Sequence, residues 1–339
     1  MRCFRIRFRD LVIVECDGKL YRKSEVEFPD AVRVARLFKK HGNLELIRDG
    51  RFLIGSVCDG KIRGKRVDVL PDGKKLSKGY SLFAKDLVVH DERSSGHWDV
   101  LFRNPSGSFS YLYTLDKIRI SKEKKFKIVD DFESCLPRLK RNLLRALGED
   151  DLVLAMLVLL KTKIRVGGEI YYKRNRHKGL TTLKKKDLDI KGDYVVFSFI
   201  GKDGVPQVLK KKFSKRVVAE LKKVLRKRKR DDFVFLNGGK RVFRDSDFEA
   251  GFERFCGERF YPHIVRSHFA TREVEGFLRR SVRGKKRISE DAKKFCLKLA
   301  GELGHKKFSK KKGEWENSYE VTLHHYVRPD LVEKIRKLL

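Results

Sequence analysis

The stretch from residue 162 to residue 207 constrains the fold most. It reads TKIRVGGEIYYKRNRHKGLTTLKKKDLDIKGDYVVFSFIGKDGVPQ. Residues 179–183 and 194–200 are typical of short strands, and the GKDG that follows the second of them is typical of a tight hairpin turn. The pattern therefore predicts a small sheet that lies between Arg165 and Lys202.

Two parts of the chain differ in periodicity. Residues 1–120 alternate like short strands and contain Gly and Asp turns, which predicts a β-rich N-terminal domain with one helix near residues 30–41. Residues 121–131 are charged and poor in turn residues, and we interpret them as a linker. Residues 132–339 are expected to form a mainly helical domain with a small sheet, so the predicted fold class is α+β. The helices are predicted at residues 132–147, 151–163, 215–228, 245–256, 264–279, 289–303 and 329–339.

The charge of the chain indicates a polyanionic partner. The sequence has 82 Lys and Arg against 46 Asp and Glu, a formal net charge of +36. Such a surface attracts nucleic acid and binds it with an affinity that falls as salt rises. Charge alone is also compatible with a ribosomal type of protein or with a solvated basic surface.

The spacing of the cysteines and the length of the apolar runs further restrict the class of protein. The six cysteines contain no Cys-x-x-Cys pair, which disfavours zinc and a disulfide framework. The longest apolar run, residues 152–160, is far shorter than a membrane span, and the first residues do not resemble a signal peptide. We therefore expect an intracellular, reduced protein with no membrane partner. Two Met residues beside abundant Lys, Glu and Arg favour a thermophilic source.

Further downstream, the sequence offers groups suited to phosphodiester chemistry. PHIVRSHFAT contains His263 and Arg266, LGHKK contains His305, and HHYVRPDLV contains Tyr326. A phosphodiester is a poor electrophile, so cationic donors must be held around its oxygens while a nucleophile attacks in line. Arginine suits this task because a guanidinium stays protonated and can grip two oxygens at once.

These motifs resemble a known family. IRVGGEIYYKRNRHKGLTTLKKKDL followed by FSFIGKDG resembles the core of the type IB DNA topoisomerases, and the later motifs resemble the tyrosine recombinases equally, which share that catalytic fold. The resemblance implies a monomeric enzyme that closes as a clamp around double-stranded DNA and relaxes supercoils through a 3′-phosphotyrosyl intermediate, without ATP, metal or another cofactor. It assigns phosphate binding to Arg165, Arg266 and His305, protonation of the leaving 5′-oxygen to Lys202, and nucleophilic attack to Tyr326.

Some assignments stay open at this point. Tyr326 follows His305 by 21 residues, so an insertion must be assumed, and Tyr319 is the alternative nucleophile. The resemblance matches Tyr171 to a DNA-contacting position, whereas the adjacent Tyr172 is expected to pack. We expect His263 either to assist phosphate binding or to be a hydrogen-bonded core residue.

Each residue also has a structural alternative: Arg165 could be a surface phosphate contact, Lys202 a plain turn residue, Arg266 part of a buried ion pair, and His305 a helix C-cap. Two other functions compete with the topoisomerase. A tyrosine recombinase would use the same cleavage step on paired sites as a tetramer. An architectural DNA binder would need the charge alone.

Overall fold

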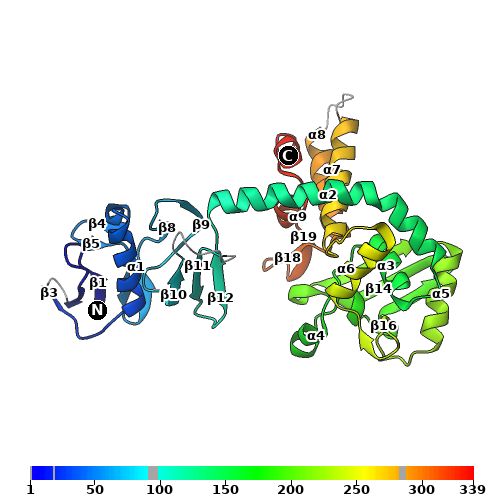
Figure 1. The fold of residues 1–339 in the computed structure, drawn as a ribbon, viewed down its shortest axis with the longest axis horizontal. Helices are drawn as coiled ribbons and strands as arrows, with labels where there is room; N and C mark the ends of the chain where they lie inside the picture. The colour runs from blue at the N-terminus through cyan, green and yellow to red at the C-terminus, as the bar shows by residue number, and fades with distance from the viewer. Residues whose placement is uncertain (1, 18–19, 91–97, 282–287) are drawn as a thin grey trace. The chain divides into compact units, whose positions relative to one another are not determined.

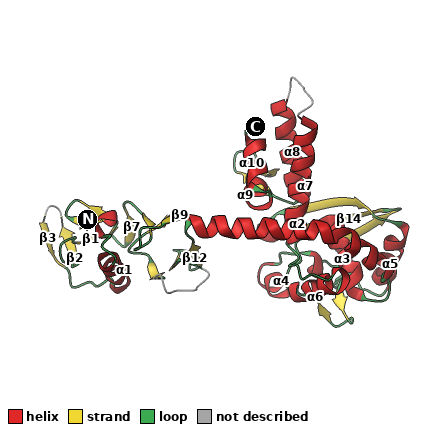
Figure 2. Cartoon of the chain, turned by 45° about the horizontal axis from the view of Figure 1, so that its top comes forward, coloured by secondary structure: helices red, strands yellow, loops and turns green. Residues whose placement is uncertain are grey.

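The computed structural model describes residues 2–17, 20–90, 98–281 and 288–339, which form two compact units, Met1–Lys124 and Lys125–Leu339 (Figure 1). We call them the N-terminal and the C-terminal unit. Strands dominate the first and helices the second (Figure 2), so the predicted α+β class is confirmed. The described helices are all too short or too polar to cross a membrane.

The N-terminal unit is built from antiparallel strands and one main helix. Its largest sheet has the order β3-β2-β1-β6-β7, and a second sheet has the order β10-β11-β12. The helix α1, Pro29–Lys40, buries Val34 and Phe38 in the core of this unit. The strands are β1 Arg2–Ile6, β2 Ile13–Asp17, β3 Leu20–Lys23, β4 Arg48–Asp49, β5 Phe52–Leu53, β6 Ser56–Cys58, β7 Lys61–Arg63, β8 Val67–Val69, β9 Lys75–Tyr80, β10 Lys85–Val89, β11 Val100–Arg103 and β12 Phe109–Leu112; η1 is Leu44–Ile47.

A disulfide joins Cys3 and Cys58 in this unit. The expectation of a fully reduced protein is therefore wrong for this pair. The two cysteines are 55 residues apart in sequence, but β1 and β6 pair in the register Cys3↔Cys58. Sequence spacing does not reveal such a cross-strand neighbour, because strand order is a property of the folded sheet.

The helix α2, Leu115–Arg145, begins in the N-terminal unit and continues into the C-terminal unit. Residues 121–131, which we predicted to be a linker, are helical throughout. Phe126, Val129 and Phe132 repeat at helical spacing and are buried in the C-terminal core. This apolar stripe explains why a strongly charged segment folds as a helix instead of remaining irregular.

In the C-terminal unit, a three-stranded antiparallel sheet, β13-β14-β15, packs one face against the core, while alternate residues of β14 on the other face are exposed or partly exposed. Helix α3 is apolar on all sides because it is buried in the core. The elements are α3 Asp151–Thr162, α4 Glu169–Asn175, η2 Leu180–Thr182, η3 Lys185–Asp187, β13 Leu188–Lys191, β14 Tyr194–Ile200, η4 Lys202–Gly204, β15 Pro206–Lys212, α5 Lys215–Arg226, β16 Leu236–Asn237, β17 Arg241–Val242, α6 Asp245–Cys256, α7 Ile264–Ser281, α8 Ile288–Glu302, β18 Lys306–Ser309, β19 Glu314–Asn317, α9 Glu320–Tyr326 and α10 Pro329–Arg336.

The two strands predicted for the small sheet had different outcomes. The strand at residues 194–200 and the turn after it are confirmed as β14 and η4. The strand predicted at residues 179–183 is wrong, because Leu180–Thr182 is a 3₁₀ turn. Thr182 Oγ1 accepts a hydrogen bond of 2.9 Å from the amide of Gly179. Such a local side-chain bond offers the backbone an alternative to strand pairing.

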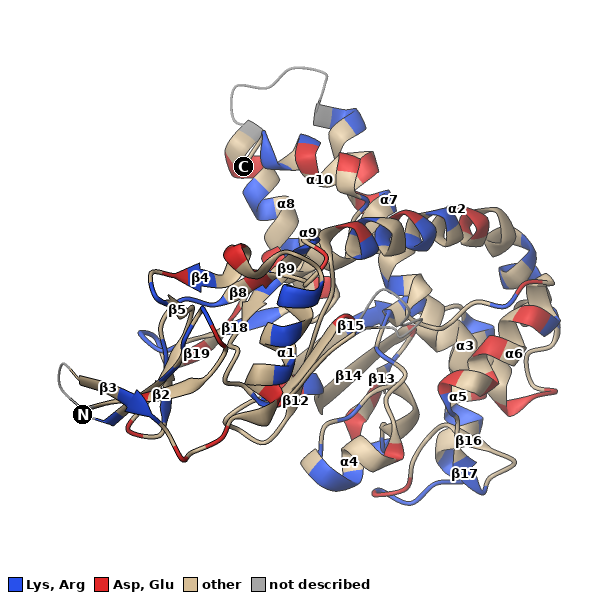
Figure 3. Ribbon diagram, turned by 60° about the vertical axis from the view of Figure 1, so that its left-hand side comes forward, with Lys and Arg blue, Asp and Glu red and all other residues tan. Residues whose placement is uncertain are grey.

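Lys and Arg residues occur on helices and strands along the whole described chain (Figure 3). Some form ion pairs on the surface, such as Arg254 with Asp150 at 2.6 Å. The large excess of basic over acidic residues nevertheless leaves a net charge of +36 on the chain.

Candidate functional site

The hydroxyl of Tyr326 is the point at which distant segments of the C-terminal unit meet. Arg165 Nη2 donates a hydrogen bond of 3.0 Å to this hydroxyl, although the two residues are 161 positions apart. His263 Nε2 lies 2.9 Å from the same oxygen. In the neutral tautomer that carries its hydrogen on Nδ1, His263 would accept the phenol hydrogen at Nε2. Tyr326 itself is the last residue of α9 and is buried.

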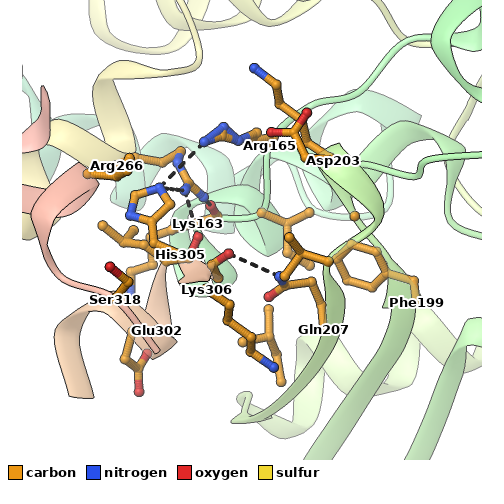
Figure 4. Close-up of a pocket in the computed structure, with 18 of the residues that line it drawn as sticks. Lys163, Arg165, Phe199, Asp203, Gln207, Arg266, Glu302, His305, Lys306 and Ser318 are labelled. Carbon is orange, nitrogen blue, oxygen red and sulfur yellow. Dashed lines mark hydrogen bonds between the residues drawn. The ribbon is translucent and has the colours of Figure 1, made fainter. Parts of the chain in front are cut away.

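Arg266 and His305 lie beside this hydroxyl. Arg266 Nη2 is 3.1 Å from His305 Nε2, and Arg165 Nη2 is 3.4 Å from the same nitrogen. The three side chains point toward one another in Figure 4. The guanidinium carbon of Arg266 is 5.2 Å from the centre of the Tyr326 ring. Two guanidinium groups, two imidazoles and a phenol therefore surround one small volume.

Arg266 is held there by main-chain oxygens. Its Nη1 donates to the carbonyl of Lys163, and its Nη2 donates to the carbonyl of Leu303 at 2.7 Å. Lys163 is the C-cap of α3 and has a left-handed backbone with φ of 58°, which directs its carbonyl away from the helix. The structure therefore does not support the alternative of a buried ion pair for Arg266, since carbonyl groups are its fixed partners.

Burial strongly affects the titration of the site. Burial, together with the charges of Arg266 and Arg165, lowers the pKa of His263 to about 3 and that of His305 to about 3. Burial and the charge of Arg165 lower the pKa of Arg266 to about 10, so Arg266 remains protonated at neutral pH. Both histidines are thus neutral beside two guanidinium groups, so the site favours an anion.

Lys202 belongs to the same site but is less confined. It is exposed at the turn between β14 and β15, and it lines a pocket of about 470 Å³ together with Arg165, Arg266 and His305. The turn is tight because Asp203 and Gly204 both have left-handed backbones, with φ of 61° and 76°. The described structure therefore brings Lys202 to the mouth of the pocket that the phosphate-binding candidates line.

Two glycines set the path of the backbone at Arg165. Gly167 has φ of +87°, and a Cβ atom added to it would lie 2.8 Å from Cα of Gly179. A Cβ added to Gly179 would lie 2.5 Å from the carbonyl oxygen of Arg165. The same carbonyl accepts a hydrogen bond of 2.7 Å from the amide of Leu180. Only glycine permits two backbones to approach this closely.

The remaining candidate tyrosines make other contacts. Tyr319 is the N-cap of α9 and packs partly buried against the apolar cluster of α7 to α10, which also contains Tyr326. Tyr171 is 70% exposed on α4. Tyr172 packs edge-on against Phe233, with ring centres 5.4 Å apart. One tyrosine of the adjacent pair is therefore free to contact a ligand, and the other one packs.

The sequence reasoning missed a residue that orients His305. Thr322 Oγ1 lies 2.7 Å from His305 Nδ1, and Thr322 is fully buried. Because His305 Nε2 faces two arginine donors, Nε2 accepts and Nδ1 carries the hydrogen that Thr322 accepts. Thr322 lies four residues before Tyr326 on α9, so the nucleophile candidate and the support of His305 share one short helix. Nothing in the motif around Tyr326 indicated that Thr322 has this role.

Comparison with known proteins assigns the family. The model of the eukaryotic DNA topoisomerase I catalytic core matches residues 117–317, more than half of the chain. The chain belongs to this family. The resemblance to the type IB topoisomerases is thereby confirmed. The matched range contains Arg165, Lys202, Arg266 and His305, whereas Tyr326 lies beyond its last residue.

Two viral topoisomerases are similar to part of the chain. The DNA topoisomerase 1B of Acanthamoeba polyphaga mimivirus is 28% identical over 104 residues, which are 29% of this chain and 31% of that protein. The DNA topoisomerase 1B of vaccinia virus (strain Copenhagen) is 31% identical over 99 residues, 29% of this chain and 32% of that protein. The match thus spans about a third of the length of each of these relatives.

Two solved structures of a site-specific recombinase are similar to part of this chain. The XerH site-specific recombinase bound to palindromic difH substrate, in a post-cleavage complex, has 16% identity and a TM-score of 0.33, covering 52% of this chain and 45% of that chain. Its pre-cleavage complex with difH substrate has 17% identity and a TM-score of 0.32, covering 52% and 46%.

Proposed function

We propose that this protein is a type IB DNA topoisomerase that relaxes supercoiled double-stranded DNA by transient cleavage of one strand. The observation that carries the proposal is the contact of Tyr326 with both Arg165 and His263, beside Arg266 and His305. A phenol hydroxyl between a guanidinium and a neutral imidazole is suited to attack a phosphate that the same guanidinium binds. Membership of the topoisomerase family supports the same conclusion.

In the proposed cleavage step, Arg165 and Arg266 bind the nonbridging oxygens of the phosphate and offset the charge that spreads over them in the transition state. The oxygen of Tyr326 bonds to phosphorus as the bond from phosphorus to the 5′-oxygen breaks. Neutral His263 takes the proton of the phenol, and Lys202 gives a proton to the departing oxygen. The product is a 3′-phosphotyrosyl link, and the reverse step rejoins the strand.

His305 has a more specific role in this scheme than the phosphate binding that the family resemblance implies. Its Nε2 accepts from Arg165 and Arg266, so His305 cannot donate through this atom while those contacts hold. A bound phosphate would draw the guanidinium groups to its own oxygens and would favour the protonated imidazole by its negative charge. We propose that His305 then donates to a nonbridging oxygen, with Nδ1 still held by Thr322.

The scheme uses no metal, ATP or other cofactor, because the side chains supply every charge and every proton that it requires. The test is relaxation of supercoiled plasmid by the purified protein in EDTA and without ATP. We expect relaxation of positive and of negative supercoils. A strict requirement for magnesium or ATP would overturn the mechanism, and strand exchange between two DNA molecules without relaxation would favour a recombinase.

The remaining parts of the proposal concern the assembly. We propose that one monomer suffices, since Arg165, Arg266, His305 and Tyr326 come together within one chain. Clamping of DNA by the two units and an intracellular location stay predictions. Sedimentation of the protein on a short duplex, with one protein molecule per cleaved site, tests the monomer.

A further inference from the structure

The hairpin that carries Lys202 is tied to the residues on either side of His305. The side-chain amide of Gln207 donates a hydrogen bond of 3.1 Å to the carbonyl of Gly304. In the opposite direction, Lys306 Nζ donates 2.9 Å to the carbonyl of Pro206. The first of these bonds is visible in Figure 4. The start of β15 is thereby joined to the segment that contains His305.

Gln207 also fills the space between two glycines. It is 9% exposed. A Cβ atom added to Gly201 would lie 3.2 Å from Cγ of Gln207, and one added to Gly304 would lie 2.2 Å from its Oε1. Gly201 directly precedes Lys202, and Gly304 directly precedes His305. One buried side chain therefore touches the backbone just before each of two proposed functional residues.

A second connection lies farther along the same strand. Lys211 Nζ, near the end of β15, forms an ion pair with Glu302 at the end of α8. Together with the hydrogen bonds of Gln207 and Pro206, this ion pair holds β15 beside residues 302–306. The contacts of β15 therefore hold the turn that carries Lys202 in place, whereas the Lys202 side chain itself is exposed.

The geometry matters because the proposed step needs two groups on one phosphate at the same time. Arg266 and His305 would bind the nonbridging oxygens, while Lys202 must reach the departing 5′-oxygen within hydrogen-bond distance. A displacement on the order of 1 Å can cost on the order of 100-fold in rate when it misplaces a reacting group.

We propose that Gln207 is a positioning residue that sets the placement of Lys202 relative to His305 and so controls protonation of the leaving oxygen. The inference rests on the proposed cleavage function. In that step the bond from Tyr326 Oη to phosphorus forms, the bond from phosphorus to the 5′-oxygen breaks, and Lys202 gives one proton to that oxygen. Gln207 does not contact the DNA in this scheme.

A sulfur atom in place of the bridging 5′-oxygen isolates this role. A thiol has a pKa of about 8.5, so a thiolate leaves near neutral pH without a proton. Cleavage of a suicide duplex is measured in single turnover, once with a bridging oxygen and once with a bridging sulfur at the mapped cleavage site. The variants are Gln207→Met, which keeps the volume but removes the donor, and Val208→Met as its control. Val208 is the next residue on β15 and is 71% exposed.

We expect Gln207→Met to slow cleavage of the oxygen substrate by about 10- to 100-fold, less than the roughly 10²- to 10⁴-fold effect of a complete general acid. Cleavage of the sulfur substrate should stay within about twofold of the Val208→Met rate, because no proton is required there. Equal slowing on both substrates, or slowing on neither, would overturn the proposal.

Two further measurements keep the result interpretable. The wild-type protein must cleave the oxygen substrate, and failure there would count against the proposed function itself and not only against the role of Gln207. If Gln207→Met does not fold, Lys306→Met removes the second bond of the same connection and is tested with the same pair of substrates. We expect the same selective loss on oxygen, and a loss on both substrates would contradict the proposal.

Discussion

The hydroxyl of Tyr326 lies 2.9 Å from Nε2 of His263, and the two rings are tilted by 42° with centres 5.2 Å apart. His263 directly precedes α7, while Tyr326 ends α9. The sequence left open whether His263 assists phosphate binding or is a hydrogen-bonded core residue, and its contact with the candidate nucleophile leads us to propose a part in the cleavage step. Its pKa, lowered to about 3, keeps the imidazole neutral at neutral pH, and the negative charge of a bound phosphate would raise that pKa and make the nitrogen a stronger base.

The first prediction concerns this proton transfer. His263→Gln keeps a polar group of similar reach but cannot take up a proton, so formation of the covalent adduct should slow by about 100-fold or more, the lower end of the range of general base catalysis. Affinity for uncleaved DNA should change little. The rate of adduct formation on a suicide duplex is the measurement, and an unchanged rate would assign His263 to packing alone.

The second prediction separates the two tyrosines. Tyr326→Phe removes the only oxygen at that position, so no DNA adduct should form, whereas Tyr319→Phe should remain active because Tyr319 packs at the start of α9. Peptide mapping of the trapped adduct identifies the modified residue. An adduct on Tyr319, or one that persists in Tyr326→Phe, would reassign the nucleophile, and an adduct on neither would favour a noncatalytic DNA binder.

The third prediction tests the support of His305. Thr322→Val has nearly the same shape but leaves Nδ1 of His305 without its partner at 2.7 Å. A lost partner of a buried polar group costs about 1 to 3 kcal/mol, so both the free energy of unfolding and the cleavage rate should fall. Thr322→Ser retains the hydroxyl and should restore the cleavage rate. If Val and Ser variants cleave equally, the hydroxyl does not orient His305.

The fourth prediction concerns acid stability. Because His263 and His305 have folded pKa values of about 3, below the ordinary 6.5, the unfolded chain binds protons first as the pH falls. Their contribution is complete above pH 6.5 and is lost progressively toward pH 3. Between about pH 6.5 and pH 5 the loss should be on the order of 2 kcal/mol for each histidine.

Urea unfolding at each pH measures this loss, and His263→Gln or His305→Gln should each flatten the dependence over the same range. Carboxylates also titrate at lower pH, but they are common to all three proteins and cancel in the comparison. An equal slope in wild type and variants would contradict the lowered pKa values.

The fifth prediction concerns salt. The β18–β19 hairpin begins one residue after His305 and exposes Lys310 and Lys311 at its turn. If these lysines contact phosphates, Lys310→Gln with Lys311→Gln should reduce the slope of log affinity against log salt by up to about 0.9 for each contact. The exposed Lys222 and Lys223 of α5 are the matched control pair. Equal slopes for both double variants would show that the hairpin is not part of the DNA interface.

Much of the site could be predicted from sequence because its residues lie in short motifs with a chemical reason for their type. Arg165, Arg266, His305 and Tyr326 were each predicted from motifs that resemble the type IB topoisomerases or the tyrosine recombinases, and the structure brings their side chains together. Their hydrogen-bond directions could not be predicted, since the acceptor role of His305 Nε2 depends on two arginines from other segments.

The errors have a common physical origin. The strand predicted at residues 179–183 has suitable composition, but its turn is closed by contacts with residues 165–166, which are distant in sequence. The disulfide was missed because the pairing of β1 with β6 brings Cys3 to Cys58. In both cases contacts with a segment distant in sequence overrode a local pattern, and at residues 179–183 the local bond from Gly179 to Thr182 acts in the same direction.

The close approach of the two backbones at Gly167 and Gly179 determines which substitutions this site tolerates. The backbone of Arg165 is held by main-chain atoms that all amino acids share, so its path depends little on the types of the side chains in the two segments. The two glycines are the exception, because any larger residue there would force the segments apart. The substitutions that disrupt this segment are therefore expected mainly at Gly167 and Gly179, which themselves take no part in the chemistry.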